Sequence, residues 1–219
     1  MAERYPLLLD LAGRPCLVVG GGPVAARKVD GLAAAGAAIA VVAPAAVAAI
    51  AAAAASGTLT WHRRAFREED LEGHVLAFAA TSDPGVNRAV AQAARLRGVW
   101  LNRADDPADC DFHVPATLRR GPVTVAVSTD GASPALAAWL RDRVAERLPP
   151  ELATLAELVG ALRQQTRADT GAFRGLFAAG ILEDLGRDDW LAVERKVRTH
   201  FGEGEAVRGI LRGLHPEGR

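Results

Sequence analysis

The sequence predicts an α/β protein that starts with a parallel, doubly wound sheet and ends in a purely helical region. Up to about residue 102, short apolar runs of strand length alternate with helical patterns. Such alternation indicates parallel strands joined by right-handed helical crossovers. Beyond Pro149-Pro150 no run of residues has a strand pattern. A pair of strand-like runs and one helix separate these regions, so we expect three parts along the chain.

The first strand, turn and helix carry the clearest functional signal. The apolar run Cys16–Gly20 leads into Gly20-Gly21-Gly22, and Pro23 opens a helix over Val24–Ala35. The spacing reads G-x-G-x-x-A: Gly20 allows the tight turn, Gly22 lets the backbone approach a pyrophosphate, and Ala25 keeps the helix close to the sheet. Free N–H groups and the positive end of the helix dipole would then face the phosphates. This segment predicts a dinucleotide-binding site.

The following segments continue the alternation of strands and helices. An apolar stretch such as VLAFAA is typical of a strand covered on both faces. Proline and glycine mark most of the boundaries between segments. The predicted strands are Ala38–Ala43, Leu59–His62, Val75–Ala80 and Val99–Asn102, and the predicted helices are Ala45–Ala55 and Asp83 or Pro84 to about Arg97.

After Asp111 the pattern changes. The runs Phe112–Leu118 and Val123–Ser128 flank a turn at Arg119-Arg120-Gly121-Pro122, as in a strand pair. A helix is then predicted from Ser133-Pro134 to about Leu148, with Ser133 as its N-cap and the proline at its first position. The pair Pro149-Pro150 ends this part, and helical patterns follow to the end.

Composition excludes several classes of function. Lys plus Arg equals Asp plus Glu at 26 each, and the isoelectric point is about 7.0, so nothing global favours nucleic acid or an anionic membrane. The uncharged stretch Leu32–Ala55 has the length of a membrane span, but it is mostly alanine and holds Gly36 and Pro44, so we expect it to divide into helix, strand and helix. Two cysteines give no disulfide framework, which fits a cytoplasmic location. The histidine spacing predicts no built-in metal site.

Two segments, Ala80–Pro84 and Asn102–Pro107, lie where such a fold binds ligands, beyond the carboxyl ends of strands, and the end of the second strand normally carries the residue that binds the ribose. The second strand ends in Ala43-Pro44-Ala45, without an acidic residue for a ribose 2′-hydroxyl or an arginine for a 2′-phosphate. Either Pro44 and Ala45 pack against the adenosine while backbone groups form the hydrogen bonds, or the site is degenerate. Thr81 follows the fourth strand in the segment Ala80–Pro84.

The carboxylate Asp105 follows the fifth strand, within Asn102–Pro107. There it could accept a proton while hydride leaves for a nicotinamide. Asp105 and Asp106 could equally be turn residues before Pro107, because Asp-Pro pairs often start turns. Further along, Ser128, Thr129 and Gly131 precede a helix and could bind an anionic group at its start.

Taken in order, these segments resemble the precorrin-2 dehydrogenase family, also known as the siroheme synthase N-terminal region. The matching text is PLLLDLAGRPCLVVGGGPVAARKVDGLAAAGA, VVAP, AATSDPGVN, LNRADDP, FHVPA and VAVSTDGASPALAAWLRDRV. The match is close over residues 5–148 and loose over the helical remainder. Several independent motifs in register make it far more specific than the glycine turn alone.

The resemblance implies an NAD-dependent oxidation of precorrin-2 to sirohydrochlorin, in sirohaem or cobalamin biosynthesis, by a homodimer. It implies a Rossmann NAD-binding domain over residues 1–113, a dimerisation segment over 114–148 and a helical domain over 149–219. It places the catalytic role on Asp105. The implied cofactor contacts are Gly20, Gly21, Gly22, Pro23, Val24, Pro44, Ala45 and Thr81, and the candidate substrate contacts are Asn102, Ser128, Thr129, Gly131, Arg119 and Arg120.

Some features depart from the family or stay open at this level. Thr129 stands where members often carry a serine, so no serine-specific role is transferred to it, and the role of His113 is open. Arginines suit recognition of substrate carboxylates, although exposed arginines are usually only solvated. One alternative is a bifunctional enzyme that also inserts ferrous ion or cobalt into sirohydrochlorin. Others are a non-catalytic module that binds NAD or a tetrapyrrole, and an unrelated small-molecule dehydrogenase.

Overall fold

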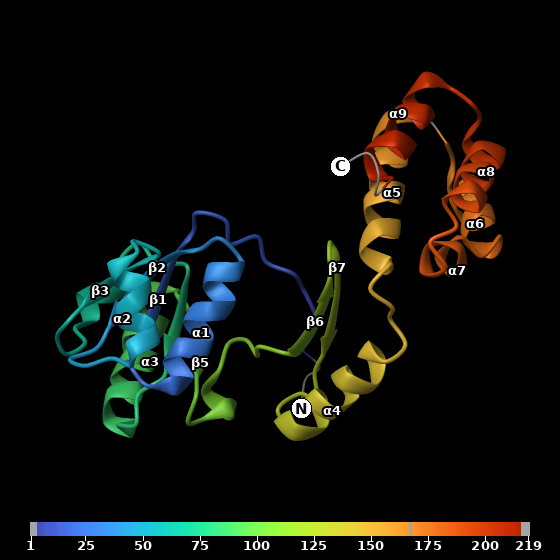
Figure 1. Ribbon diagram of the computed structural model, residues 1–219. Coiled ribbons are helices and arrows are strands. Elements are labelled where there is room, and N and C mark those ends of the chain that lie inside the picture. The colour runs from blue at the N-terminus through green and yellow to red at the C-terminus, as the bar shows by residue number, and fades with distance from the viewer. Residues whose placement is uncertain (1–3, 167, 216–219) are drawn as a thin grey trace. The chain divides into compact units, whose positions relative to one another are not determined.

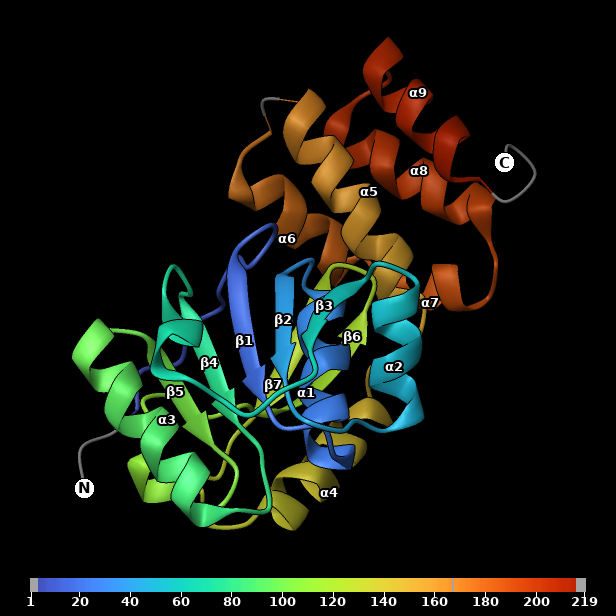
Figure 2. The ribbon, with the colours of Figure 1, turned by 90° about the vertical axis from the view of Figure 1, so that its left-hand side faces the viewer.

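The computed structural model describes residues 4–166 and 168–215. The chain divides into two compact units, and the boundary between them falls after Val114. The first unit is a five-stranded sheet in the order β3-β2-β1-β4-β5, and every pair of neighbouring strands is parallel. Figure 2 shows the strands pointing the same way. The predicted Rossmann-type fold is confirmed. Its elements are β1 (Pro15–Val19), α1 (Pro23–Ala34), β2 (Ala38–Val42), α2 (Ala48–Ala55), β3 (Leu59–His62), η1 (Glu68–Leu71), β4 (Leu76–Ala79), α3 (Pro84–Arg97), β5 (Trp100–Arg103) and η2 (Pro107–Asp109).

Helices cover both faces of this sheet (Figure 1). The helices α1 and α2 pack on one face, where Ala25 and Val18 are fully buried, while α3 and η1 pack on the other. Because both faces are covered, β1 and β4 are apolar along nearly their whole length, as the continuous apolar runs predict. The full burial of Ala25 confirms that a small residue is needed where α1 approaches the sheet.

The second unit contains an antiparallel pair of strands and six helices in its described part. The pair β6 and β7 is joined by a tight turn at Gly121-Pro122, and α4 packs on it. The remaining helices form a bundle around Leu158, Leu162 and Leu176, which are fully buried. The elements are β6 (Ala116–Arg120), β7 (Val123–Val127), α4 (Pro134–Ala145), α5 (Leu152–Gln165), α6 (Thr170–Ala178), α7 (Ile181–Gly186), α8 (Trp190–Phe201) and α9 (Glu205–Leu214).

Several predicted boundaries are wrong, and α4 ends at Ala145 rather than at about Leu148. Arg119 and Arg120 lie in β6 rather than in the turn, because they pair with Thr124 and Val123. The strand begins at Ala116 rather than Phe112, because the Phe112 ring packs edge to face on Phe78 in the first unit, with ring centroids 5.4 Å apart. The helix α2 begins three residues later than Ala45, because the preceding loop is hydrogen-bonded to the glycine turn. Whether residues 114–148 serve as a dimerisation segment stays a prediction.

The uncharged stretch Leu32–Ala55 divides into the end of α1, strand β2 and helix α2, as expected from its glycine and proline. In the part of the chain that the structure describes, we find no helix with the length and apolar character of a membrane span.

Candidate functional site

The glycine turn after β1 is held between the ends of β2 and β4. Gly20 has φ +130° and donates its N–H to the Val42 carbonyl at 3.0 Å, and a Cβ on it would overlap the Ala80 carbonyl. A Cβ on Gly21 would overlap the Ala45 carbonyl. These two positions therefore exclude any side chain, and the turn is fixed by its two neighbours.

Gly22 differs from the other two glycines because a Cβ built on it meets no atom within 4 Å. It is the N-cap of α1, where no side chain caps the helix and no acidic residue lies in the first turn. Pro23 occupies the first helical position, where its missing N–H costs nothing. The open space at Gly22 and the uncapped helix end fit the pyrophosphate of a dinucleotide, with Pro23 and Val24 beside it.

The loop after β2 lies directly against the glycine turn. The Val47 N–H donates to the Gly21 carbonyl at 2.8 Å, and Pro44 and Ala45 are exposed. No carboxylate stands in this loop. The structure thus brings Pro44 and Ala45 to the position expected for the adenosine end, and contact with a cofactor there stays a prediction.

The end of β4 is organised by a buried amide that the sequence analysis missed. Asn87 on α3 is fully buried, and its Oδ1 accepts from the Thr81 N–H at 3.2 Å and from the Thr81 hydroxyl at 2.8 Å. Its Nδ2 donates to the Thr81 carbonyl at 3.2 Å. Asp83 caps α3, its carboxylate accepting from the N–H groups of Gly85 and Val86. The signal for Asn87 was an amide within an apolar helical face, because such a group is buried only with partners.

Asp105 lies just beyond β5, at the same edge of the sheet. The Arg103 guanidinium donates to both of its oxygens, Nε to Oδ1 at 3.2 Å and Nη2 to Oδ2 at 2.9 Å. The Asp105 side chain is 28% exposed, and that of Arg103 is only 7% exposed. The hydrogen bonds from Arg103, with a smaller contribution from the Asn87 side chain, hold the pKa of Asp105 below its usual value. Asp105 is therefore ionised at neutral pH.

Arg103 also binds the short helix η2. Its Nη1 lies 2.6 Å from an Asp109 oxygen and 3.5 Å from an Asp106 oxygen, and Arg95 on α3 pairs with Asp109. Asp106 caps η2 through the Ala108 N–H, so this residue has the turn role that the Asp-Pro pair predicted. The predicted fifth strand ends at Asn102, whereas β5 runs from Trp100 to Arg103, so the sequence analysis left Arg103 in the loop and gave it no role.

The next residues of this loop serve the packing of the segment that follows. Asn102 is buried, and its Nδ2 donates to the Phe112 carbonyl at 2.9 Å. The His113 Nε2 lies 3.3 Å from the Pro107 carbonyl oxygen, which gives this side chain a local partner. Contact of Asn102 with a substrate stays a prediction.

The remaining predicted substrate residues lie in the second unit. Ser133 caps α4 as predicted, its hydroxyl accepting from the Leu136 N–H at 3.1 Å. Ser128 and Thr129 bond within the loop, Ser128 to the Asp130 N–H and Thr129 to the Ser133 backbone. Gly131 there has φ +85°.

Arg119 and Arg120 on β6 are the predicted ligands for substrate carboxylates. The Arg120 Nε donates to the Leu148 carbonyl at 3.3 Å, and Arg119 is exposed. These contacts account for the local structure, and substrate binding by the second-unit residues stays a prediction.

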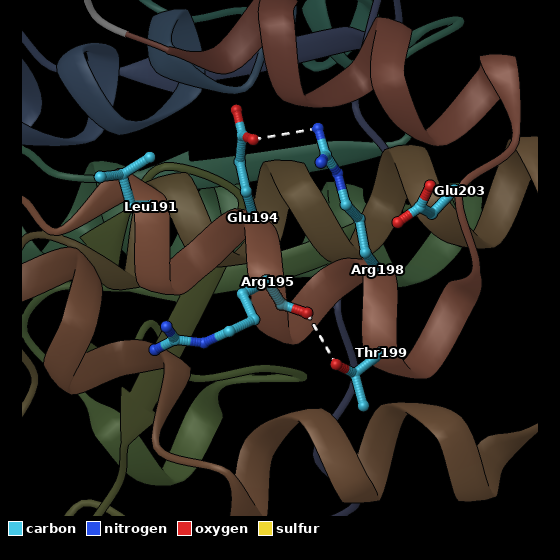
Figure 3. A pocket seen from close by; sticks show the side chains of 6 residues that line it. All are labelled: Leu191, Glu194, Arg195, Arg198, Thr199 and Glu203. Carbon is cyan, nitrogen blue, oxygen red and sulfur yellow. Dashed lines mark hydrogen bonds and ion pairs between the residues drawn. The ribbon is translucent and has the colours of Figure 1, made fainter.

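A hollow of about 390 Å³ lies along α8 in the helical bundle, and Figure 3 shows the side chains that line it. Glu194 and Arg198 form an ion pair at 3.1 Å, and the Thr199 hydroxyl donates to the Arg195 carbonyl at 2.8 Å. These contacts are those of an ordinary helix surface. The residues that line it are Leu191, Glu194, Arg195, Arg198, Thr199 and Glu203. Among the described residues, no three or more His, Cys, Asp or Glu side chains are grouped so that they could hold a metal ion.

Comparisons with known proteins agree with this geometry. A family model described as putative NAD(P)-binding matches residues 7–116, half of the chain, and one described as sirohaem biosynthesis protein central matches residues 120–147. The solved structure titled SirC, precorrin-2 dehydrogenase, has a TM-score of 0.69 and 30% identity, over 90% of this chain and 98% of that chain. The chain belongs to the precorrin-2 dehydrogenase and siroheme synthase family.

Curated members of this family extend the comparison. The siroheme synthase of Methylococcus capsulatus is 48% identical over 165 residues, which are 75% of this chain and 35% of that protein. The siroheme synthase of Methylobacillus flagellatus is 36% identical over 213 residues, which are 96% of this chain and 44% of that protein. The chain therefore spans less than half the length of these two siroheme synthases.

Proposed function

We propose that this chain oxidises precorrin-2 to sirohydrochlorin with NAD⁺ as electron acceptor. Family membership supports this reaction. One structural observation supports placing the reaction at the edge of the sheet where the glycine turn lies. An ionised carboxylate, Asp105, is held by Arg103, and its pKa is lowered further by Asn87, at the same edge of the sheet as the glycine turn. Ligands of open parallel sheets bind at this edge.

The reaction removes one hydride and one proton from the reduced macrocycle. Bound NAD⁺ supplies the hydride acceptor. The glycine turn and the start of α1 hold the pyrophosphate, and Asp105 receives the proton at a carboxylate oxygen. Because Arg103 stabilises its ionised form, Asp105 is a weak base. A weak base suffices here, because loss of hydride leaves a cationic macrocycle whose neighbouring C–H and N–H groups are acidic.

The test is an anaerobic assay in which precorrin-2 is generated in situ and NADH absorbance is followed. Replacing Asp105 by Asn should lower turnover by about a hundredfold, the usual contribution of a positioned proton acceptor, with NAD⁺ affinity retained. The matched control is Asp106→Asn, which makes the same change at the next residue and should keep most turnover. Unchanged turnover in the Asp105 variant would remove this residue from the mechanism. Absence of NADH formation by the native chain would instead favour the non-catalytic binding module.

A homodimer is part of the proposal, and the surface of β6, β7 and α4 supports it. A two-stranded sheet is marginally stable by itself, yet along these three elements only Ala137 is buried. The α4 side chains Leu136 and Trp139 are 47% and 53% exposed. A second copy on this face would supply the missing apolar burial. Light scattering should give twice the chain mass, and a monomeric mass at micromolar concentration would contradict the dimer.

Insertion of ferrous ion into sirohydrochlorin by the same chain, and a cytoplasmic location, are further parts of the proposal that the family suggests. Both cysteines, Cys16 and Cys110, are free thiols, which fits a reducing compartment. Anaerobic incubation of sirohydrochlorin with ferrous ion, with and without the protein, tests the insertion activity. An equal rate in both samples would reject it.

A further inference from the structure

The end of β3 brings an arginine beside the end of β2, a proximity that the sequence pattern did not reveal. Strands β2 and β3 are parallel neighbours with Val42 opposite His62, and the Ala43 N–H donates to the His62 carbonyl at 3.2 Å. Arg63 therefore follows β3 at the level where Ala43 and Pro44 follow β2. In folds of this class, the group that follows β2 determines whether a 2′-hydroxyl or a 2′-phosphate is bound on the adenosine ribose.

Trp61 fixes the arginine in this place. The indole Nε1 donates to the Ala43 carbonyl at 3.0 Å, so the ring extends from β3 to the end of β2. The Arg63 guanidinium carbon lies 4.3 Å from the centre of that ring. Stacking on an aromatic face orders a guanidinium while leaving its N–H groups available at the edge.

Of the two arginines that follow β3, Arg63 is the one whose positive charge is available to a ligand. Arg64 is held by Asp70, its Nη1 lying 2.8 Å and its Nη2 2.5 Å from the two carboxylate oxygens. The ion pairs found among the described residues do not involve Arg63, which is exposed. The β2 loop carries no carboxylate that would repel a phosphate, and it contacts the glycine turn through Val47 and Gly21.

We propose that Arg63 binds the 2′-phosphate of NADP⁺ and that the chain accepts NADP⁺ as well as NAD⁺. A phosphate monoester carries a charge of about −1.5 to −2 at pH 7. A guanidinium binds it through charge-assisted, bidentate hydrogen bonds. This inference rests on the proposed dinucleotide site and adds a specificity-determining residue to it.

Calorimetric titration of the full chain with NAD⁺ and with NADP⁺ tests the proposal without catalysis. Replacing Arg63 by Gln should weaken NADP⁺ binding by about tenfold, the loss expected for one charge-assisted contact. NAD⁺ binding should change by less than about twofold. The matched control is Arg14→Gln, an equal charge change on an exposed residue directly before β1, at the opposite edge of the sheet. It should leave both affinities unchanged.

Adenosine 2′,5′-bisphosphate and adenosine 5′-monophosphate provide a second comparison. The native chain should bind the bisphosphate more tightly, and the Arg63 variant should lose that difference. Thermal melting of both variants shows whether they are folded, and Arg63→Lys, which keeps the charge without the planar fork, should retain part of the NADP⁺ affinity.

Two outcomes overturn the inference while leaving the proposed function in place. One is that the native chain binds NAD⁺ but not NADP⁺, and the other is that the Arg63 variant weakens both cofactors equally. If the native chain binds neither dinucleotide, the proposed function fails first and this inference fails with it.

Discussion

The two glycines Gly21 and Gly22 are adjacent, yet the structure predicts opposite consequences for an added methyl group. A Cβ on Gly21 overlaps the Ala45 carbonyl, whereas a Cβ on Gly22 meets nothing within 4 Å. Gly22 has φ −85° and ψ −175°, an extended conformation that alanine adopts without strain. Replacing Gly22 by Ala should therefore affect ligand binding, and replacing Gly21 by Ala should affect stability.

The magnitudes follow from the surroundings of each position. For Gly21→Ala, the loop at Ala45 must move, which costs about 1 to 3 kcal/mol of stability as in other overpacked sites. For Gly22→Ala, reduced freedom of the unfolded chain stabilises by about 0.4 to 1 kcal/mol. The loss of a glycine N-cap costs a similar amount, so the net change should be within about 1 kcal/mol of zero.

Urea unfolding and NAD⁺ calorimetry together test this pair. The Gly22 variant should unfold at nearly the native urea concentration yet bind NAD⁺ at least about tenfold more weakly, because its methyl group occupies the approach of the pyrophosphate. The Gly21 variant should unfold at a lower urea concentration than the native chain. Native NAD⁺ affinity in a folded Gly22 variant would refute the reasoning that the open space beside this glycine receives the phosphates.

Two further predictions concern charged residues. Because Arg103 lowers the pKa of Asp105, activity that needs the ionised carboxylate is present above that low pKa and lost as pH falls through it. Arg103→Met should therefore move the acidic limb of the pH–rate profile to higher pH, whereas the control Arg95→Met should leave it in place. An unmoved limb in the Arg103 variant would show that Arg103 does not set the pKa of Asp105. In the helical bundle, Asp184 is 2% exposed and pairs with Lys196 and with Arg187, which keeps its pKa low. The contribution of Asp184 to stability is present above its pKa in the unfolded chain and is lost as pH falls through its pKa in the folded chain. Asp184→Asn should lower the free energy of unfolding, measured with urea at neutral pH, by about 2 to 4 kcal/mol and should make stability depend less on pH in the acid range. A loss under about 1 kcal/mol would contradict a structural role for this ion pair.

Local patterns predicted much of this protein correctly. The strand Leu59–His62 and the helix Pro84–Arg97 have their expected bounds, and Ser133 caps α4 as expected. These features depend on residues adjacent in sequence, such as a capping side chain and the proline after it. The strand predicted to begin at Phe112 begins later, at Ala116, because the Phe112 side chain packs on Phe78 in the first unit.

The same local patterns predicted only part of the candidate site. The glycine turn and Asp105 could be found from spacing, together with the resemblance to the family. Asn87 could not, because it lies on another element, α3. Arg103 lies only two residues before Asp105, but the pattern did not show that its guanidinium binds that carboxylate. Whether side chains from two elements meet depends on strand order and on which face each occupies.

The sequence by itself determined where the chain turns, which runs form strands and helices, and which glycines stand at the start of α1, because each of these follows from neighbouring residues. Only the tertiary structure decided that Asn87 on α3 helps to lower the pKa of Asp105 and that Arg63 stands beside the end of β2. Those facts arise from contacts between segments that parallel strand pairing brings together, and the energy of a charge or a buried amide depends on such contacts.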